Sequence, residues 1–371
     1  MIDQERLLIT FLDLVRIDSP SGEEGKIAQH VLARLRALGL EASIDATGNV
    51  IAKLAGEGEP ILLNAHLDNV MPCLGIVPIV ADGVVRSDGR TVLGADDKSG
   101  VAVILEVLQA IRGLLHPPLE VVLTVQEETG LRGAKVLEFA QLQAKMGISL
   151  DTEGSIGSVV VSAPSHNSIS AVVHGKAAHA GTHPEEGINA ILVAAEAIAQ
   201  MPLGRIDFET TANIGVIKGG RATNIVPDRV EVRGEARSRD EGKLRSQTDK
   251  MVKALRDAAS RHGATVDVGV EREYLAFKLS EEDEIVRRAM AAARSIGLEP
   301  ELVASGGGSD ANIFNAHGIK VLNVSTGMEK VHTTEEHIAV ADMVKCAELV
   351  SAILTAQTSN SATGGELWAT P

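Results

Sequence analysis

Short apolar runs alternate with helical stretches along most of the chain, and one block in the middle breaks this alternation. The runs ILLNA at 61–65 and LEVVLTV at 119–125 indicate buried strands, and the apolar helical stretch GVAVILEVLQAIRGLL lies between them. Strands that alternate with helices predict a parallel sheet. We therefore expect an α/β domain with a mostly parallel sheet and helices on both faces.

The middle block follows a different order, with a strand, a helix, two strands, a long helix and a strand. The periodicity places these elements at 168–174, 188–201, 212–218, 228–236, 240–262 and 265–274. The order βαββαβ is typical of a small two-layer domain. The earlier alternation then resumes with a helix at 281–296, the strand IKVLNV and a helix at 341–356.

This change and return of pattern predict a discontinuous parallel-sheet domain with a second domain inserted into it. The expected bounds are 1–165 and 275–360 for the discontinuous domain and 166–274 for the inserted domain. Residues 361–371 lack periodicity and are rich in Ser, Thr and Gly, so we expect a flexible tail. Near the start, Ser21 and Glu24 indicate a capping box for a helix that stops at Gly39.

The charge of the chain argues against two classes of partner. Fifty Asp and Glu residues against 35 Lys and Arg leave a formal charge of −15 over 371 residues, which disfavours binding to phosphate backbones and anionic lipid. One Trp, one Tyr and five Phe provide few rings for stacking on bases. We expect neither a nucleic-acid partner nor a membrane partner.

Cysteine usage and the first residues indicate a cytoplasmic protein. Cys73 and Cys346 are too few for a disulfide framework and lack the spacing of a thiolate zinc site. The first helix carries acidic residues where a signal peptide would need a basic end and an unbroken apolar core. The most apolar stretch, 101–115, is interrupted by charges and is too short to span a membrane.

Polar side chains follow three of the predicted strands at the point where each strand ends. His66 and Asp68 follow ILLNA, Glu127 and Glu128 follow LEVVLTV, and Asp151 follows the strand MGISL. In open α/β sheets the site lies beyond the carboxyl ends of the strands, so these side chains are expected to meet in one crevice.

Two loops add further candidates. Asp96 and Asp97 in GADDKSG stand just ahead of a helix, and His332 in MEKVHTTEEH follows the strand IKVLNV. Any one of these acidic residues, taken alone, is most often a cap or a solvated turn residue. His66 taken alone is as easily a satisfied core histidine. Their joint occurrence around one crevice favours a metal site.

The charges of this set suit a pair of metal ions. Two divalent cations carry four positive charges, and Asp96, Glu128 and Asp151 carry three negative ones, which leaves one charge for a bridging hydroxide to cancel. Oxygen and imidazole ligands favour Zn²⁺, with Co²⁺ or Mn²⁺ as alternatives. Such a pair activates water for amide hydrolysis, and one carboxylate of Glu127-Glu128 can act as general base while the other binds metal.

The motifs resemble those of a known enzyme family. HLDNV, GADDKSG, QEETG, LDTEGSIG, GKAAHAG, ATNIVPD, GGGSDAN and EKVHTTEEH occur in order from about residue 60 to 340. They resemble the di-zinc exopeptidases and deacylases that include peptidase T, glutamate carboxypeptidase, acetylornithine deacetylase and succinyl-diaminopimelate desuccinylase. GADDKSG, QEETG and GGGSDAN are most similar to the peptidase T-like tripeptide aminopeptidases.

The resemblance implies a ligand set. His66 and Asp151 would bind one zinc ion, Glu128 and His332 would bind the other, and Asp96 would bridge them. This arrangement would be the metal centre of a hydrolase of the resembled family.

The resemblance also implies roles for the neighbours of these ligands. Asp68 would hold the His66 imidazole in its metal-binding tautomer, and Glu127 would be the general base and later the acid for the leaving amine. Asp97 is interpreted as a cap or a supporting residue. Asn69 is a departure, because the family usually has Thr at this position.

The inserted domain supplies substrate-contact candidates. His179 matches a family histidine that reaches across a dimer interface to stabilise the oxyanion, although the residues alone do not separate it from His183. Asn224 and Arg237 match positions that hold carboxylate or carbonyl groups of the substrate, and the Arg fork suits a carboxylate. Gly307, in the run GGG, either presents a backbone N–H to substrate or simply forms a turn.

The sequence therefore predicts a metallopeptidase that releases the N-terminal residue of short peptides. The resemblance further implies that the discontinuous domain, 1–165 and 275–360, is catalytic, and that the inserted domain, 166–274, is a lid and dimerisation domain that forms a homodimer. A carboxypeptidase, a dipeptidase or an N-acyl-amino-acid deacylase on the same scaffold would use the same residues. A non-catalytic metal-containing binding protein is a third reading, although the base and all the ligands are present. A dinucleotide enzyme is disfavoured because no strand is followed by G-x-G-x-x-G.

Overall fold

The computed structural model describes residues 1–355 of the chain, so the expected tail at 361–371 lies outside the described residues. The described chain forms two compact units. Unit 1 comprises Met1–Val159, Ser280–Leu302 and the chain from Gly318, and unit 2 comprises Val160–Leu279 and Val303–His317. The sequence assigned 303–317 to the second stretch of the catalytic domain, whereas these residues cluster with unit 2.

Unit 1 contains a central sheet whose strands follow the order β1-β2-β6-β3-β7-β16. Their bounds are Glu41–Ile44, Val50–Leu54, Leu119–Thr124, Ile61–His66, Met146–Ser149 and Lys320–Val324, in that order. The pairs β3–β6, β3–β7 and β7–β16 are parallel, and β1–β2 and β2–β6 are antiparallel. The predicted mostly parallel sheet is therefore confirmed.

The register of the parallel strands brings their carboxyl ends to one edge. His66 at the end of β3 pairs with Thr124 at the end of β6. Ser149 at the end of β7 pairs with Asn64 on one side and with Asn323 on the other. Every residue of β3 and β6 is buried, as expected for parallel strands covered on both faces. The segments that follow these strands consequently start from the same edge.

Helices pack against this sheet and against one another. Unit 1 contains α1 (Gln4–Val15), α2 (Gly25–Ala37), α3 (Ala95–Ala110), α4 (Arg132–Lys135), α7 (Glu284–Ser295) and α9 (Val340–Thr355), with a 3-10 turn η1 at Phe139–Gln141. The central helix, α3, packs against α1, α9 and β3. None of the described helices combines the length and the apolar character needed to cross a membrane.

The predicted capping box at the start of α2 is wrong. The helix begins at Gly25, and its N-cap residue Glu24 makes no side-chain cap bond. Ser21 Oγ instead donates to Asp68 Oδ2 at 2.6 Å. Glu24 Oε1 accepts from the backbone N–H of Gln126 at 3.0 Å. The two polar side chains face the loops after β3 and β6, because those loops offer donors and acceptors that need buried partners.

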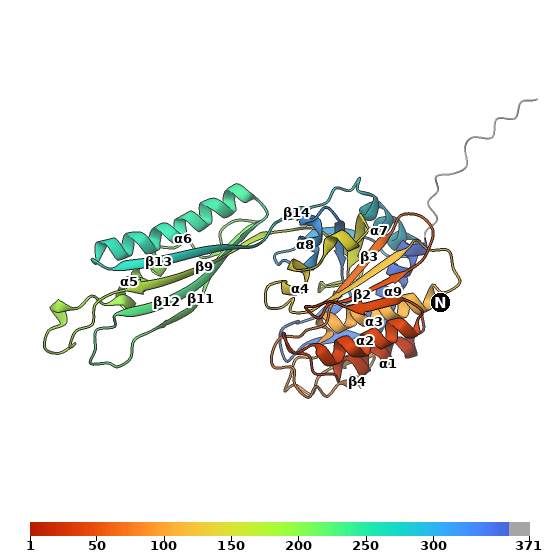
Figure 1. The fold of residues 1–371 in the computed structure, drawn as a ribbon, viewed down its shortest axis with the longest axis horizontal. Coiled ribbons are helices and arrows are strands. Elements are labelled where there is room, and N and C mark those ends of the chain that lie inside the picture. The colour runs from red at the N-terminus through yellow and green to blue at the C-terminus, as the bar shows by residue number, and fades with distance from the viewer. Residues whose placement is uncertain (356–371) are drawn as a thin grey trace, which may run out of the picture. The chain divides into compact units, whose positions relative to one another are not determined.

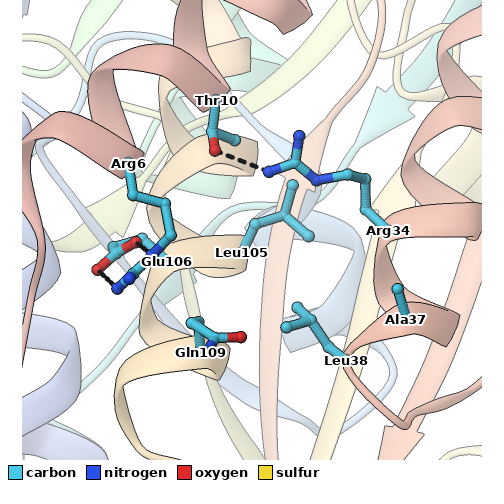
Figure 2. Close-up of a pocket in the computed structure, with 8 residues that line it drawn as sticks. All are labelled: Arg6, Thr10, Arg34, Ala37, Leu38, Leu105, Glu106 and Gln109. Carbon is cyan, nitrogen blue, oxygen red and sulfur yellow. Dashed lines mark hydrogen bonds and ion pairs between the residues drawn. The ribbon is translucent and has the colours of Figure 1, made fainter.

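Two arginines tie the helices of unit 1 together, as Figure 2 shows. Arg6 of α1 donates from Nε and Nη2 to the carboxylate of Glu106 on α3, at 2.7 and 2.6 Å. Arg34 of α2 donates to Thr10 Oγ1 on α1 at 2.7 Å. These side chains line a cavity of about 230 Å³. Because the Glu106 side chain is only 1% exposed, loss of Arg6 would leave a buried charge unpaired.

A second, small sheet in unit 1 has the order β17-β18-β5-β4. These strands span Met328–Glu329, His337–Ala339, Val84–Arg86 and Ile79–Ala81, in that order. Glu329 pairs with His337, so the residues between them form the turn that carries His332. The sequence analysis missed this sheet because strands of two or three residues are too short to show a period of two.

Unit 2 contains an antiparallel sheet with the order β10-β11-β12-β9-β13, covered by α5 and α6 (Figure 1). The strands span Gly204–Arg205, Thr210–Gly219, Arg229–Ser238, Ser165–His174 and Thr265–Tyr274, and the helices span Ala190–Ala199 and Glu241–Arg261. The predicted order βαββαβ is confirmed, with β10 as an addition. Unit 2 also contains β14 (Phe277–Lys278), η2 (Pro184–Glu186) and α8 (Asp310–Ala316), while β8 (Ser158–Ala163) and β15 (Glu301–Ala304) run across unit boundaries.

The two faces of the unit 2 sheet differ in character. Apolar residues of α5, α6 and the strands form a core on one face, with Val173, Val230 and Leu244 fully buried in it. The other face carries polar side chains at alternate positions of β9 and β12. The register pairs Arg229 with His174 at one end of this face and Arg237 with His166 at the other.

Candidate active site

Asp96 lies between two imidazole rings in unit 1. Its Oδ1 is 3.0 Å from Nε2 of His66, and its Oδ2 is 3.0 Å from Nε2 of His332. The same His332 nitrogen is 2.9 Å from Glu128 Oε1. Because each oxygen of Asp96 faces a different histidine, this carboxylate has the arrangement of a ligand shared by two cations.

Asp151 completes the cluster on the His66 side, with Oδ1 3.9 Å from Nε2 of His66. Two sets of side chains place their ligand atoms within 4.8 Å of one another, namely His66, Asp96 and Glu128, and His66, Asp97 and Asp151. The structure thus brings together all five ligands expected from the sequence. Imidazole nitrogens and carboxylate oxygens at these separations fit divalent ions such as Zn²⁺, Co²⁺ or Mn²⁺.

The electrostatics of the cluster also fit cations. Hydrogen bonds to Asp96 and Glu128 raise the pKa of His332 to about 10. Burial acts to lower the pKa of His66, but Asp68 and Asp96 outweigh it and hold that pKa well above the ordinary value. Burial acts to raise the pKa of Asp96, but the two histidines outweigh it and hold that pKa well below its usual range. Positive charge therefore stabilises the carboxylates of this cluster, and either protons on the imidazoles or bound cations can supply it.

Asp68 orients both His66 and the loop that carries the glutamates. The His66 Nδ1 is 3.0 Å from the backbone carbonyl of Asp68 and 3.5 Å from its Oδ1, so Nδ1–H points toward Asp68 and Nε2 toward Asp96. The Asp68 carboxylate accepts from the backbone N–H groups of Glu127 at 3.0 Å and Glu128 at 3.2 Å. Asp68 thus fixes the ring of His66, one candidate ligand, and the backbone N–H of Glu128, another candidate ligand.

The loop after β6 is held in an uncommon conformation. Gln126 has a φ of +54°, in the left-handed region that non-glycine residues rarely adopt. His332 has a φ of +63°. Such backbone persists only where surrounding contacts determine it, and it gathers at functional sites. Glu127, the expected base, follows directly after Gln126 and is 9% exposed.

Asp97 is fully buried beside the cluster. Its Oδ2 accepts from the backbone N–H of His66 at 3.1 Å, and its Oδ1 accepts from that of Gly100 at 3.2 Å. Burial raises the pKa of Asp97 well above the ordinary value. A Cβ at Gly100 would lie 2.5 Å from Asp97 Oδ1, so glycine is needed for this approach. The contacts agree with the interpretation of Asp97 as a supporting residue.

The sequence analysis assigned no role in the candidate site to four buried or half-buried side chains around the cluster. Ser21 and Glu24 were read as a helix cap, Asn69 was noted only as a departure from the resembled motif, and Glu336 was passed over. Burial raises the pKa of Glu336 to about 7. The sequence offered one signal for these residues: each is a polar residue at a position that neither an apolar helix face nor a motif explains.

In unit 2, His179 and Asn224 lie side by side. Ile225 bridges to His179, and the backbone N–H of Ala180 donates to the carbonyl of Asn224 at 3.0 Å. The Nδ1 of His179 accepts from the N–H groups of Gly181 and Thr182, at 3.1 and 3.2 Å. In the neutral ring Nε2 therefore carries the proton, and the exposed side chain can offer it to an oxyanion.

Arg237 and Gly307 form a second group in unit 2. The Arg237 Nε and Nη2 donate to the two oxygens of Glu235, both at 3.0 Å. A Cβ at Gly307 would lie 3.9 Å from the remaining nitrogen, Nη1 of Arg237. The N–H of Gly307 donates to Ser305 Oγ at 3.0 Å, so in this state it is used within its own turn. His166 Nε2 lies 3.2 Å from Glu235 Oε2.

These two groups stand at opposite ends of the unit 2 sheet. His179 and Asn224 lie beyond the first residue of β12, and Arg237 lies next to its last residue. The strand is 10 residues long, and at about 3.3 Å per residue its ends are roughly 30 Å apart. An extended tripeptide spans only about 10 Å. One small substrate therefore cannot touch both groups of the same chain.

Family models match both parts of the chain. A model described as a peptidase dimerisation domain, of the M20 type, matches residues 164–263. A model described as peptidase family M28 matches residues 49–197. The first match coincides with most of the block that the sequence analysis identified as an inserted domain.

Known proteins match over nearly the whole chain. The uncharacterized protein YqjE of Bacillus subtilis is 42% identical over 366 residues, which cover 95% of this chain and 99% of that protein. A peptidase T of Clostridium botulinum is 25% identical and covers 93% of this chain and 97% of its own.

Two solved structures are similar throughout. The aminopeptidase PepT of Bacillus cereus is 43% identical with a TM-score of 0.87, and covers 95% of this chain and 98% of its own. A tripeptidase of Staphylococcus aureus is 41% identical with a TM-score of 0.91, and covers 96% and 98%. With identity above 40% over almost the full length, and with candidate metal-ligand groups in the structure, the chain belongs to the peptidase T-like branch of the M20 metallopeptidase family.

Proposed function

We propose that the protein is a di-zinc exopeptidase that releases the N-terminal residue of short peptides, above all tripeptides. The observation that carries this proposal is the Asp96 carboxylate set between His66 and His332, with the Glu127-Glu128 pair beside it. The similar solved structures are described as an aminopeptidase and a tripeptidase, which supports the substrate class.

The residues divide into two metal sites that share one ligand. We assign His66 and Asp151 to one ion, Glu128 and His332 to the other, and Asp96 to both. When bound, two divalent ions would supply Lewis-acid activation of a water molecule and of the scissile carbonyl. Zn²⁺ suits these nitrogen and oxygen donors, and Co²⁺ or Mn²⁺ would suit them as well.

Glu127 is assigned the proton transfers. It is next to a proposed ligand, and its backbone is anchored by Asp68. As general base it takes a proton from the attacking water, and as general acid it returns that proton to the leaving amine. Asp68 supports both steps by fixing the His66 ring and the backbone of the loop that carries Glu127 and Glu128.

The substrate-contact residues are assigned by their chemistry. The Arg237 guanidinium would bind the terminal carboxylate of the peptide, with Gly307 in the facing turn. Asn224 would donate to a carbonyl group, and the Nε2–H of His179 would stabilise the oxyanion of the tetrahedral intermediate. Because His179 and Arg237 stand at opposite ends of β12, we assign His179 to the active site of a second copy of the chain.

A homodimer through unit 2 would place the second copy. The match to a dimerisation domain supports this arrangement. β10 pairs with Thr211 and Ala212, and no other strand of residues 1–355 covers the rest of this edge of β11, which is therefore available to another strand. Apolar side chains are exposed along this edge and on the neighbouring helix α5, namely Val216, Ile217, Ile191 and Leu192. We also place the enzyme in the cytoplasm, since Cys73 and Cys346 are both free thiols.

Product analysis by mass spectrometry tests the proposed reaction. Zinc-loaded protein is incubated with free tripeptides, with N-blocked and C-blocked versions of them, and with N-acyl amino acids. We expect release of the first residue from free tripeptides and loss of cleavage on N-blocking. The Glu127→Gln variant should keep its metal content and lose about 10²- to 10⁴-fold in kcat.

Three outcomes would contradict the proposal at different levels. Cleavage restricted to C-terminal or N-acyl bonds would make the protein a carboxypeptidase or a deacylase and leave the metal chemistry intact. Near-normal turnover by metal-loaded Glu127→Gln would remove Glu127 from the mechanism. Metal binding without cleavage of any substrate in the panel would favour a non-catalytic binding protein.

A further inference from the structure

Glu336 binds the backbone on the amide side of Asp96. Its Oε2 accepts from the N–H groups of Leu93 at 2.7 Å and Gly94 at 2.8 Å. Its Oε1 accepts from the N–H of Asp96 at 2.9 Å. The residue is 1% exposed, and the steps proposed above do not use it. A single buried carboxylate therefore holds three amides of the segment that presents Asp96.

Asn69 binds the same segment from its carbonyl side. Its Nδ2 donates to the backbone carbonyl of Asp96 at 2.6 Å, and the residue is 1% exposed. Its own N–H donates to the carbonyl of Ser19 at 2.9 Å, which fixes where the side chain starts. A Cβ at Gly94 would lie 2.9 Å from Asn69 Nδ2, so the side chain packs directly on this glycine. The peptide groups on both sides of the Asp96 Cα are thus held by side chains.

Glu336 also links two ligands that are far apart in sequence. It lies in the turn between β17 and β18, the turn that carries His332. Its hydrogen bonds to Leu93, Gly94 and Asp96, at the start of α3, therefore fix the His332 turn against the Asp96 segment. These hydrogen bonds therefore help to hold the Asp96 carboxylate and the His332 imidazole at their 3.0 Å approach.

We infer that Asn69 and Glu336 are positioning residues that orient the Asp96 carboxylate toward His66 and His332 and thereby set the affinity of the chain for its metal ions. This inference rests on the proposed metal centre, and it explains the departure at Asn69. A ligand that is already oriented loses little freedom when the ion binds, and partners behind metal ligands typically contribute 10- to 100-fold to metal affinity. Neither side chain is assigned a direct contact with metal or substrate.

Titration of metal-free protein with Co²⁺ tests this role without any substrate. Calorimetry reports the affinity and the number of ions bound, and the visible absorption of Co²⁺ reports the geometry of its ligands. Glu336→Gln keeps the shape but turns one acceptor into an NH₂ group that faces backbone N–H groups. Asn69→Leu keeps the approximate size and removes the donor. We expect Co²⁺ affinity to fall about 10- to 100-fold in each variant, with a changed visible spectrum.

Matched controls are available in the same chain. Glu335 is adjacent to Glu336, but its exposed side chain pairs with Lys330 at 2.6 Å. Asn213 is exposed in unit 2. The variants Glu335→Gln and Asn213→Leu carry the same chemical changes and should bind Co²⁺ as the unaltered protein does.

A purely structural role would give a different result. Variants of Glu336 and Asn69 that unfold at lower temperature but bind Co²⁺ with unaltered affinity and spectrum would overturn the inference. If Glu336→Gln does not fold, Asn69→Thr, which shortens the side chain, decides by the same criteria. If the unaltered protein binds no Co²⁺, the proposed metal centre itself is wrong and this inference falls with it. If it binds Co²⁺ but cleaves no peptide, only the proposed reaction fails, and the titration still decides the role of the two side chains.

Discussion

Arg237 is held by Glu235 in a geometry that lysine cannot reproduce. Two parallel hydrogen bonds of 3.0 Å fix the plane of the guanidinium and leave Nη1 for another partner. Arg237→Lys should therefore raise KM for free tripeptides about 10- to 100-fold with little change in kcat, because a charge-assisted hydrogen bond is lost. Steady-state kinetics with free and C-amidated peptides measure this effect.

The matched control for this substitution is Arg239→Lys, two residues further on. Arg239 lies 4.0 Å from Glu209 and is placed in no substrate contact. The KM of the Arg239→Lys variant for free tripeptides should stay unchanged. If Arg237→Lys raises KM equally for free and C-amidated peptides, Arg237 does not bind the terminal carboxylate.

Glu235 gives the protein a pH-dependent contribution to stability. Hydrogen bonding to His166 is the largest cause that lowers the pKa of Glu235, and with Arg237 it brings that pKa to about 2 against partial burial, which acts to raise it. The ordinary value is 4.5. Because the folded pKa is depressed, the contribution is complete above pH 4.5 and is lost as the pH falls toward 2. In urea unfolding, the stability difference between the unaltered protein and Glu235→Gln should be constant above pH 5 and narrow below about pH 4.5. A difference that stays constant down to pH 3 would contradict this assignment.

The candidate ligands were predictable because of where they stand along the chain. Asp151 follows a buried strand directly, and the end of a parallel strand has few structural uses for a buried carboxylate. The contacts of Ser21 and Glu24 were not predictable, because a serine followed three residues later by a glutamate fits a helix cap equally well. Their true partners, Asp68 and Gln126, come from distant loops that only the folded chain brings near.

At the scale of elements, the turn after β15 depends on close packing against the end of β13. A Cβ at Gly308 would lie 2.3 Å from the ring of Tyr274, which in turn packs edge-on against His166 with ring centroids 5.3 Å apart. Gly308→Ala should therefore destabilise the protein by about 1–3 kcal/mol through overpacking. Urea unfolding measures the change.

Gly306 provides the comparison within the same turn. A Cβ there would meet nothing of the described chain within 4 Å, and its φ is not in the left-handed region. Gly306→Ala should be neutral or stabilise by about 0.4–1 kcal/mol, because alanine restricts the unfolded chain. An equal loss of unfolding free energy in both variants would show that stability depends on the conformation of the turn rather than on the contact with Tyr274.

Periodicity predicted the long elements better than the short ones. β3 and β6 are continuous apolar runs, and α6 shows a helical period over 21 residues, so each is visible without its neighbours. The strands β4 and β5 have three residues each, and all three of β4 are exposed. They form because β18 pairs with β5, a long-range contact that leaves no local pattern.

At the scale of the whole molecule, the proposed dimer depends on one edge of the unit 2 sheet. Ile217 on the open edge of β11 is 49% exposed, and Val270 on the opposite edge strand β13 is 47% exposed. Ile217→Lys should shift the sedimentation mass toward one chain, because it places a charge in an apolar interface, whereas Val270→Lys should not.

The activity of the same variants tests the role of His179. If His179 acts in the active site of a second copy, Ile217→Lys should lose kcat in step with the loss of dimer, and activity should recover at high protein concentration. A fully active single chain would show that His179 is not needed from a partner. If the Val270→Lys protein sediments as a single chain, the dimer interface lies at the β13 edge instead.

The insertion of unit 2 between strands of unit 1 also governs how the enzyme is made. Ribosomes synthesise His66, Asp96, Glu128 and Asp151 before the inserted segment and His332 after it, with a delay on the order of tens of seconds. During that interval β7 lacks its partner strand β16, and the proposed metal centre lacks His332. We expect the growing chain to stay inert as a peptidase until translation has passed His332, so that an unfinished enzyme does not attack peptides while it is still on the ribosome.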